Sequence, residues 1–336
     1  MRTASRSAPK RKDKRCVARK TRGLQVSQTP AATFILLSYC QEDTITEAVE
    51  SLLEQNCEPI EIIISDDAST DGTFDKIQEL TNSYRGPHSL KARRNDMNLG
   101  LNRHIELAIS LASSDLMIWA AGDDRNAPGR IQKIVDCHRK TGAKLIFSDA
   151  ETVGPQGGPG GNAYKRALFY KNFNTLDAAT SFSLFLGATA AWHKDLYRKY
   201  GGLPEDSAYE DLILGFRALL EDGLHYIPEK LVIYKEDVGI SAQLTKKIST
   251  LTNQERRTRM LKGQLAVLEQ RLADARTFGL AENSPVVRKM TQAAGKIRAR
   301  LDFYDGIGAV LASGHYGWGA KLQGIASEGM RRLRNR

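Results

Sequence analysis

Short apolar runs alternate with amphipathic segments along much of the chain. TFILLSY (residues 33–39) and IEIIIS (residues 60–65) have the length and the continuous apolar character of buried strands. Between them, ITEAVESLLEQ (residues 45–55) spaces its apolar side chains as one face of a helix does. The same pattern predicts strands over residues 90–93, 115–120, 143–149, 225–227 and 231–234, and helices over about 72–84, 102–112, 195–200 and 209–221, with another after Pro128. This alternation predicts an α/β fold in which a mostly parallel sheet has helices on both faces and functional groups at the carboxyl ends of its strands.

The glycine-rich segment VGPQGGPGGN (residues 153–162) is too irregular for a phosphate-binding fingerprint, and we interpret it as a seam between two halves of the sheet region. From about residue 242 onward the pattern is helical. We therefore predict a disordered basic tail, an α/β domain and a helical C-terminal region, over residues 1–30, 31–242 and 243–336.

The C-terminal helical region carries apolar side chains at the spacing of one helix face. They are Leu244, Ile248 and Leu251, and later Val286, Met290, Ile297 and Leu301. Two interpretations stay open. The face packs against the rest of the chain or against a partner subunit in an oligomer, or it lies peripherally on a membrane, helped by basic ends such as MRRLRNR. The longest apolar runs fall far short of the roughly 18 residues that cross a bilayer.

The net charge of +10 is concentrated at one end of the chain. Residues 1–23 contain ten Lys or Arg and one acid, Asp13, whereas the remainder holds 39 basic and 38 acidic groups. This basic segment is poor in large apolar side chains, so it is expected to be disordered. It lacks the apolar core of a signal peptide. It can attract anionic lipid or nucleic acid or stay solvated, but the near-neutral body argues against a protein specific for nucleic acid.

The four cysteines show no paired spacing, so neither a zinc site nor a disulfide framework is indicated. Their arrangement fits a reducing compartment. We therefore expect a cytoplasmic protein, either free or peripheral at the inner face of the membrane.

The first acidic site is SDDASTDGT (residues 65–73), directly after a predicted buried strand. An ordinary capped turn into the next helix explains Asp71 and Gly72. It does not explain two adjacent carboxylates, Asp66 and Asp67, at the end of the strand. Such carboxylates can accept hydrogen bonds from a nucleoside base and its ribose.

Two further acidic pairs follow in the sequence. Asp123 and Asp124, in AAGDDRNAP, come at the end of the fourth predicted strand. Because neighbouring carboxylates repel each other, their pairing favours a hard divalent cation, Mg²⁺ or Mn²⁺, that also binds phosphate oxygens. Glu210 and Asp211, in SAYEDLILGFRALLEDG, begin a helix whose dipole stabilises anions, which is also their simplest explanation when they are taken alone.

The order and spacing of these three sites resemble the inverting glycosyltransferases of family 2, which share the GT-A fold. The resemblance spans about residues 32–242. It is carried by FILLSYCQEDTITEAVESLLEQ, IEIIISDDASTDGT, NLGLNRHIELAISLASSDLMIWAAGDD, LGATAAWHKDLYRKYGGLPED and YEDLILGFRALLEDG. It implies a Rossmann-like, mostly parallel sheet flanked by helices, a GT-A domain over residues 31–242, and a helical C-terminal extension.

The resemblance also implies roles for individual residues. Asp67 with Asp66 would hold the uridine end of a nucleotide sugar, most simply a UDP-sugar. Asp123, at the last position of the family's Asp-x-Asp motif, would hold the metal that bridges the diphosphate. Asp211 matches the general base, which takes a proton from a saccharide or other hydroxyl acceptor while one hexosyl group is transferred with inversion. Polysaccharide or glycan assembly is the process implied.

Three departures from the family pattern qualify these roles. Ala121 replaces the first acid of Asp-x-Asp, so ribose contact there is lost or passes to Asp124. YKED places Asp237 where a metal-ligating histidine would be expected, and the missing Gln-x-x-Arg-Trp motif favours a single addition over processive synthesis. A non-catalytic nucleotide-sugar-binding or scaffold protein of the same fold therefore remains the alternative. Trp192 is predicted either to stack on an acceptor sugar or to pack in the core.

Overall fold

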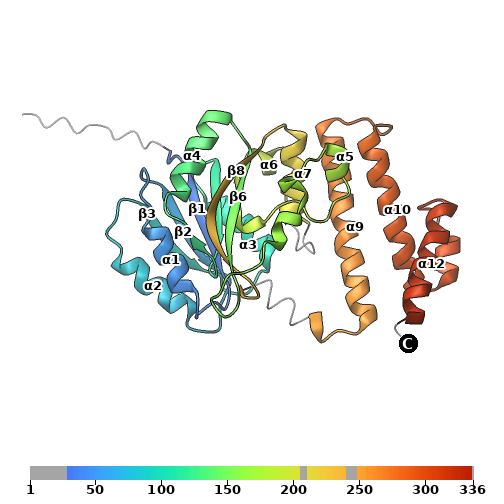
Figure 1. Cartoon of the computed structure of the whole chain (residues 1–336), viewed down its shortest axis with the longest axis horizontal. Coiled ribbons are helices and arrows are strands. Elements are labelled where there is room, and N and C mark those ends of the chain that lie inside the picture. The colour runs from blue at the N-terminus through green and yellow to red at the C-terminus, as the bar shows by residue number, and fades with distance from the viewer. Residues whose placement is uncertain (1–28, 205–209, 240–247, 335–336) are drawn as a thin grey trace, which may run out of the picture.

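The computed structural model describes residues 29–204, 210–239 and 248–334. A sheet covered by helices forms one end of the molecule, and long helices form the other (Figure 1). The predicted basic tail lies outside the described residues except for its last two positions, and Leu244 lies outside them as well.

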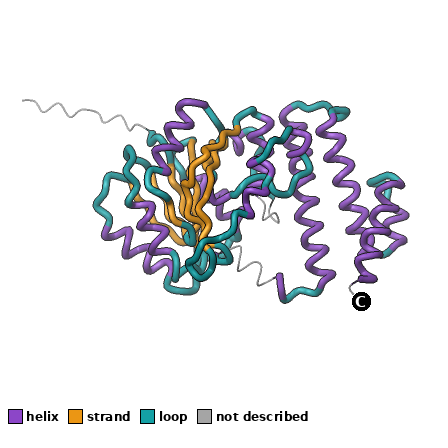
Figure 2. Tube along the Cα trace, in the orientation of Figure 1, coloured by secondary structure: helices purple, strands orange, loops and turns teal. Residues whose placement is uncertain are grey.

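Eight strands form one mixed sheet in the order β3-β2-β1-β4-β7-β6-β8-β5. They are β1 (Thr33–Ser38), β2 (Glu61–Asp66), β3 (Ser89–Arg94), β4 (Leu116–Ala121), β5 (Arg125–Asn126), β6 (Leu145–Val153), β7 (Ala191–His193) and β8 (Leu224–Lys235). The first four strands along the chain run parallel, and β7 is antiparallel to both β4 and β6. The predicted α/β fold is therefore confirmed (Figure 2).

The strands predicted over residues 225–227 and 231–234 are one continuous strand, β8. It pairs in parallel with β6 along its length, and the register shifts around Asp149. This irregularity accommodates Pro228, which cannot donate a backbone hydrogen bond to a neighbouring strand. The glycine-rich segment after β6 folds back on that strand, since Gly160 N donates to Thr152 O at 2.8 Å.

Helices cover both faces of the sheet, as the continuous apolar strands require. In β1, Phe34 and Leu36 pack toward one cluster, whereas Ile35 and Leu37 pack toward another. The first cluster is completed by α1 (Ile45–Leu53), α2 (Thr73–Ser83) and α4 (Arg130–Thr141), and the second by α3 (Leu101–Leu111), α6 (Asp195–Arg198) and α7 (Glu210–Leu220). The shorter elements are η1 (Ala163–Arg166), η2 (Leu168–Tyr170), α5 (Thr175–Ala178) and η3 (Gly187–Thr189).

The C-terminal region consists of α9 (Asn253–Phe278), α10 (Pro285–Asp305), α11 (Ile307–Ala312) and α12 (Trp318–Arg334). A third apolar cluster joins Phe216 of α7 to Leu268 and Leu272 of α9 and to Met290 and Ile297 of α10. The helices therefore extend the core of the sheet domain from α7 outward. In the part of the chain that the structure describes, no helix has the length and apolar character of a membrane span.

A buried ion pair fastens α9 to α7. Arg217 Nε donates to Asp274 Oδ2 at 2.9 Å, and the two side chains are 0% and 1% exposed. Arg217 also donates to the carbonyl oxygens of Leu196, Gly201 and Gly202. The guanidinium is thus surrounded by acceptors, which a buried cation requires.

We expect Asp274→Ala to lower the free energy of unfolding by about 3 to 5 kcal/mol, because it leaves the charge of Arg217 buried without its partner. Urea denaturation followed by circular dichroism measures the change. Asp274→Asn serves as the control and should lose less than Asp274→Ala, since its amide oxygen still accepts a hydrogen bond from Arg217. An Asp274→Ala variant within about 1 kcal/mol of the parent would contradict this account.

Candidate active site

The carboxyl ends of β1, β2 and β4 meet at one edge of the sheet. Asp67 N donates to Ser38 O at 2.9 Å, which ties the chain after β2 to the end of β1. On the other side of β1, Gly122 N donates to Leu37 O, also at 2.9 Å. The first and second acidic pairs therefore flank β1 at the same edge, as parallel strands dictate.

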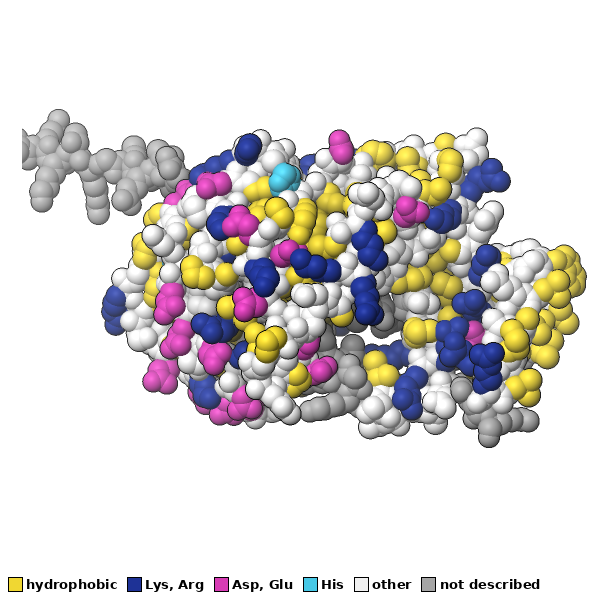
Figure 3. Space-filling view, in the orientation of Figure 1, with side chains coloured by type: hydrophobic (Ala, Val, Ile, Leu, Met, Phe, Trp, Pro, Cys, Tyr) yellow, Lys and Arg dark blue, Asp and Glu magenta, His cyan; other side chains and the backbone are white. Residues whose placement is uncertain are grey.

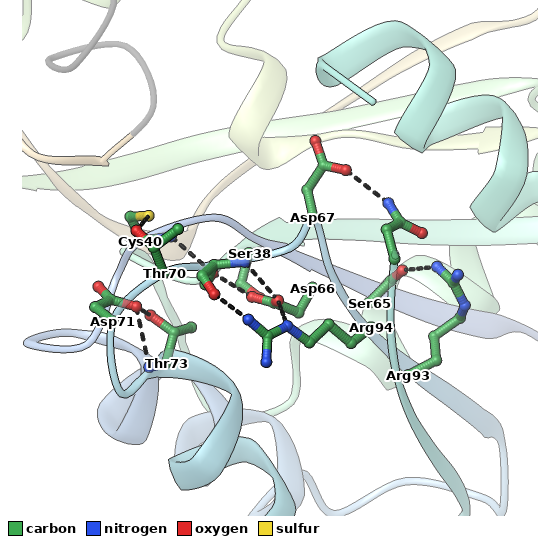
Figure 4. Close-up of polar contacts among 12 residues, drawn as sticks. Ser38, Cys40, Ser65, Asp66, Asp67, Thr70, Asp71, Thr73, Arg93 and Arg94 are labelled. Atoms are coloured by element: carbon green, nitrogen blue, oxygen red, sulfur yellow. Dashed lines mark hydrogen bonds and ion pairs between the residues drawn. The ribbon is translucent and has the colours of Figure 1, made fainter. Parts of the chain in front are cut away.

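Asp66 is committed to the turn between β2 and α2. Its carboxylate is fully buried and accepts hydrogen bonds from Ser69 N at 2.9 Å and Ser38 Oγ at 3.2 Å. Arg94 Nε lies 3.5 Å from Oδ1 (Figure 4). These contacts shape the turn, and direct contact of Asp66 with a nucleotide stays a prediction.

Asp67 points to the other side of the chain from Asp66 (Figure 4). It is 4% exposed and accepts hydrogen bonds from Asn95 Nδ2 at 2.6 Å, Leu99 N at 2.9 Å and Gly100 N at 3.0 Å. Gly100 precedes α3 with φ +77°, a conformation that favours glycine. Asp67 therefore holds the loop of residues 95–100 over the sheet edge.

The second acidic pair is almost fully buried. Gln41 Nε2 donates to Asp123 Oδ1 at 2.7 Å, and Lys235 N lies 3.3 Å from Asp124 Oδ1. Burial raises the pKa of Asp123 to about 6, and burial together with the neighbouring Asp123 raises the pKa of Asp124 well above its usual range. Two ionised carboxylates at this position would therefore need a positive charge beside them.

The chain after β8 lies directly on Asp123. Gly239 has φ +75°, and a Cβ at this position would lie 1.8 Å from Asp123 Oδ2, so a larger residue would be strained and would displace the Asp123 carboxylate. Asp237, two residues earlier, is exposed and also has a positive φ, +59°. Across residues 29–204, 210–239 and 248–334, no three His, Cys, Asp or Glu side chains group closely enough to hold a metal ion. Asp237 as a metal ligand stays a prediction.

The third acidic pair begins α7 beside the turn η3. A Cβ on Gly187 would lie 3.4 Å from Glu210 Oε1 and 3.6 Å from Asp211 Cβ. Burial raises the pKa of Asp211 to about 6, whereas burial and the charge of Asp211 raise the pKa of Glu210 to about 8. The pair therefore keeps a proton up to a higher pH than free carboxyl groups do, as expected of groups that exchange a proton near neutral pH.

Arg130 connects the second and third acidic pairs. It is fully buried and donates to Trp119 O of β4 at 2.8 Å, to Asn126 Oδ1 at 2.6 Å and to Ala188 O of η3 at 3.1 Å. Arg130 thereby fixes η3, which lies beside Asp211, to β4, which ends just before Asp123 and Asp124. Sequence reasoning missed both Arg130 and Gln41, although Gln41 follows the end of β1, where functional groups were expected.

Trp192 lies in the core. It is 3% exposed, and its ring stacks on Trp119 with centroids 4.6 Å apart. The interpretation of Trp192 as a platform for an acceptor sugar is therefore wrong, because no face of the indole is open. The core interpretation is confirmed, and the stacked pair joins β4 to β7.

Residues 33–201 match the model of glycosyl transferase family 2, and the chain belongs to this family. It is similar to the abequosyltransferase RfbV of Salmonella typhimurium, with 32% identity over 125 residues, 36% of each chain. It is also similar to the uncharacterized protein Rv1520 of Mycobacterium tuberculosis, with 33% identity over 208 residues, 60% of this chain and 58% of the relative. The matches therefore span less than two thirds of these relatives' own lengths.

Solved structures share the fold. TarS 1-349 of S. aureus, in complex with UDP, aligns with a TM-score of 0.54 and 15% identity over 80% of this chain and 71% of that chain. The mannosyltransferase PcManGT from Pyrobaculum calidifontis, in complex with GDP-Man and Mn²⁺, aligns with a TM-score of 0.53 and 18% identity over 91% and 81% of the two chains. The GT-A fold expected from the sequence is confirmed.

Glu210 gives a pH-dependent test of this geometry. Burial and Asp211 raise its pKa from 4.5 to about 8, so between these values the unfolded chain releases the proton that the folded chain keeps. Stability from this group is therefore full below about pH 4.5 and is lost as the pH rises toward 8. We expect Glu210→Gln, which cannot ionise, to gain stability relative to the parent over that range.

Urea denaturation at pH 5 and pH 8 measures this difference. Glu79→Gln, at an exposed position of α2, is the matched control and should show no such trend. An equal effect of Glu210→Gln at both pH values would mean that Glu210 ionises with ordinary ease.

Proposed function

We propose that this protein is a metal-dependent, inverting glycosyltransferase that moves one sugar from a nucleotide-diphosphate sugar to an acceptor hydroxyl during polysaccharide or glycan assembly. The observation that carries the proposal is the position of the third acidic pair, since Glu210 and Asp211 begin α7 directly beside Gly187 of η3. Arg130 and η3 link this pair to the edge that carries Asp123 and Asp124.

Asp211 is proposed to act as the general base. It takes the proton of the acceptor hydroxyl while the acceptor oxygen forms a bond to the anomeric carbon. The bond from that carbon to the diphosphate oxygen breaks in the same step, so the configuration inverts. A positioned base contributes about 10² to 10⁴-fold to such a rate.

The second acidic pair fits a divalent cation. Mg²⁺ and Mn²⁺ prefer carboxylate oxygens, and Mg²⁺ is commonly held by one or two carboxylates together with substrate phosphates. Asp123 and Asp124 offer this donor set, and Gln41 orients Asp123. The cation, when bound, would neutralise charge on the departing diphosphate. PcManGT, which shares the fold and was solved in complex with GDP-Man and Mn²⁺, supports this class of ligand.

The first acidic pair is proposed to face the nucleoside. Asp67 fixes the loop of residues 95–100 at the sheet edge, and this loop and the turn after β2 would form a wall for the base and ribose. UDP is the nucleotide in the TarS complex, which supports a UDP-sugar as donor.

We expect Asp211→Asn to fold normally and to bind nucleotide as the parent does, but to lose at least about 100-fold in turnover, because the amide cannot accept the proton. Release of nucleoside diphosphate from a panel of nucleotide sugars, with a panel of acceptors, measures turnover. The parent should lose activity as the pH falls through about 6, the pKa of Asp211. Near-normal turnover by the folded variant would transfer the role to Glu210.

Metal dependence separates an active transferase from a non-catalytic binding or scaffold protein. Nucleoside diphosphate should bind much more tightly with Mn²⁺ or Mg²⁺ than with chelator, because Asp123 would hold a cation that neutralises the diphosphate charge. Asp123→Ala should abolish the difference, and Asp237→Asn should reduce it less. Calorimetry measures both, with Asp75→Ala, an exposed aspartate of α2, as the control. Equal affinity with and without metal would favour the non-catalytic alternative.

A further inference from the structure

Helix α12 is amphipathic, but its apolar side faces outward. Trp318, Leu322, Met330 and Leu333 are 67%, 64%, 57% and 72% exposed. The positions that are buried against the neighbouring helices are instead Lys321, Gly324 and Glu328. This orientation is the reverse of the usual one, in which a surface helix turns its apolar stripe to the core.

The inverted orientation is fixed by a buried carboxylate. Glu328 is 1% exposed and accepts hydrogen bonds from Arg257 Nε of α9 at 3.1 Å and from Tyr304 OH of α10 at 2.8 Å. Arg300 Nε of α10 lies 3.9 Å from Glu328 Oε1. Rotating α12 to bury its leucines would leave these partners without Glu328, so the outward apolar face is specified by the fold.

Close helix packing supports the same orientation. A Cβ on Gly324 would lie 2.9 Å from the backbone of Ala299 in α10, so the two helices touch through glycine. Lys321 Nζ donates to Leu311 O at 2.6 Å, which ties α12 to the end of α11.

The apolar face continues onto α11, where Ile307 and Leu311 are 52% and 45% exposed. Six of the eleven large hydrophobic side chains that are exposed in the described part of the chain therefore belong to α11 and α12. Figure 3 shows hydrophobic side chains along the edge of the molecule where α12 lies, with Lys and Arg side chains next to them. So concentrated an apolar surface marks an interaction site.

Charge favours an anionic occupant. The last turn of α12 exposes Arg331, Arg332 and Arg334, and the single acid in the helix, Glu328, is turned inward. Arg331 Nε lies 3.8 Å from Glu328 Oε2, which leaves Arg332 and Arg334 to face an anionic surface. If a second copy of the chain docked through its own α12, arginines would face arginines. No acidic side chain of α12 would lie opposite to pair with them. An anionic lipid surface instead supplies both an apolar layer and negative charge.

We propose that α11 and α12 form a membrane-contact surface that rests on anionic lipid. Its apolar side chains enter the boundary between headgroups and acyl chains, where tryptophan is favoured, and its arginines meet the lipid phosphates. This inference does not depend on the proposed catalytic function.

Trp318 provides the test, because the other two tryptophans, Trp119 and Trp192, are 5% and 3% exposed. The full chain is mixed with vesicles of equal phosphatidylcholine and phosphatidylglycerol that carry brominated acyl chains. We expect bromine to quench the tryptophan emission, and Trp318→Phe to remove the quenching. Vesicles of phosphatidylcholine alone should give weaker quenching, and Arg332→Ala and Arg334→Ala should each weaken binding to anionic vesicles about fivefold.

The double variant Leu322→Glu, Leu333→Glu should lower vesicle binding by at least tenfold, because two charges would enter the apolar boundary. Leu111→Glu, Leu176→Glu is the matched control, since both leucines are exposed on the sheet domain outside this surface. Thermal unfolding verifies that each variant folds. Vesicle binding without quenching of Trp318 would overturn the proposal, because another part of the chain would then hold the lipid. A third outcome would also overturn the proposal: the parent is a dimer, the variant Leu322→Glu, Leu333→Glu is a monomer, and vesicles do not quench Trp318. The surface would then bind a second copy of the chain.

Discussion

Among the described residues, the three largest side chains that are fully buried belong to Arg130, Arg217 and Arg271. A guanidinium carries five N–H donors and a permanent charge, so it is stable in a protein interior only when acceptors surround it. Backbone carbonyls supply most of these acceptors here. Segments without regular structure, such as those around Ala179 and Gly201, are thereby fastened to the helices.

Arg271 shows how this constraint reaches the active site. It belongs to α9, outside the sheet domain, yet it donates to Leu212 O at 2.8 Å and to carbonyls of Ala178 and Ser181. Burial raises the pKa of Asp211, and the charge of Arg271 opposes that rise. The C-terminal helices are therefore part of the environment of the catalytic candidate as well as of the core.

The sequence was informative where one physical signal dominates a segment. Strands β1, β2 and β4 are buried on both faces, so each reads as an unbroken apolar run, and the acidic pairs after β2 and β4 were found with them. Strands β5 and β7 have two and three residues, and only their pairing partners define them. Arg130, Gln41 and Arg271 act across long sequence separations, which periodicity does not report. For α12, the basic end was noted from the sequence, but the apolar stripe that Glu328 turns outward was not.

The layering of helices sets a distance between the proposed lipid surface and the site of chemistry. Helix α9 packs on α7, α10 on α9, and α12 on α10. Packed helix axes lie about 8 to 10 Å apart, so α12 lies at most about 30 Å from α7, and less where Arg257 of α9 reaches Glu328 of α12. An acceptor anchored in the same bilayer would then need a headgroup long enough to span the helical layer before its hydroxyl met Asp211. Acceptor length, rather than acceptor chemistry alone, would then be selected by the thickness of the helical layer.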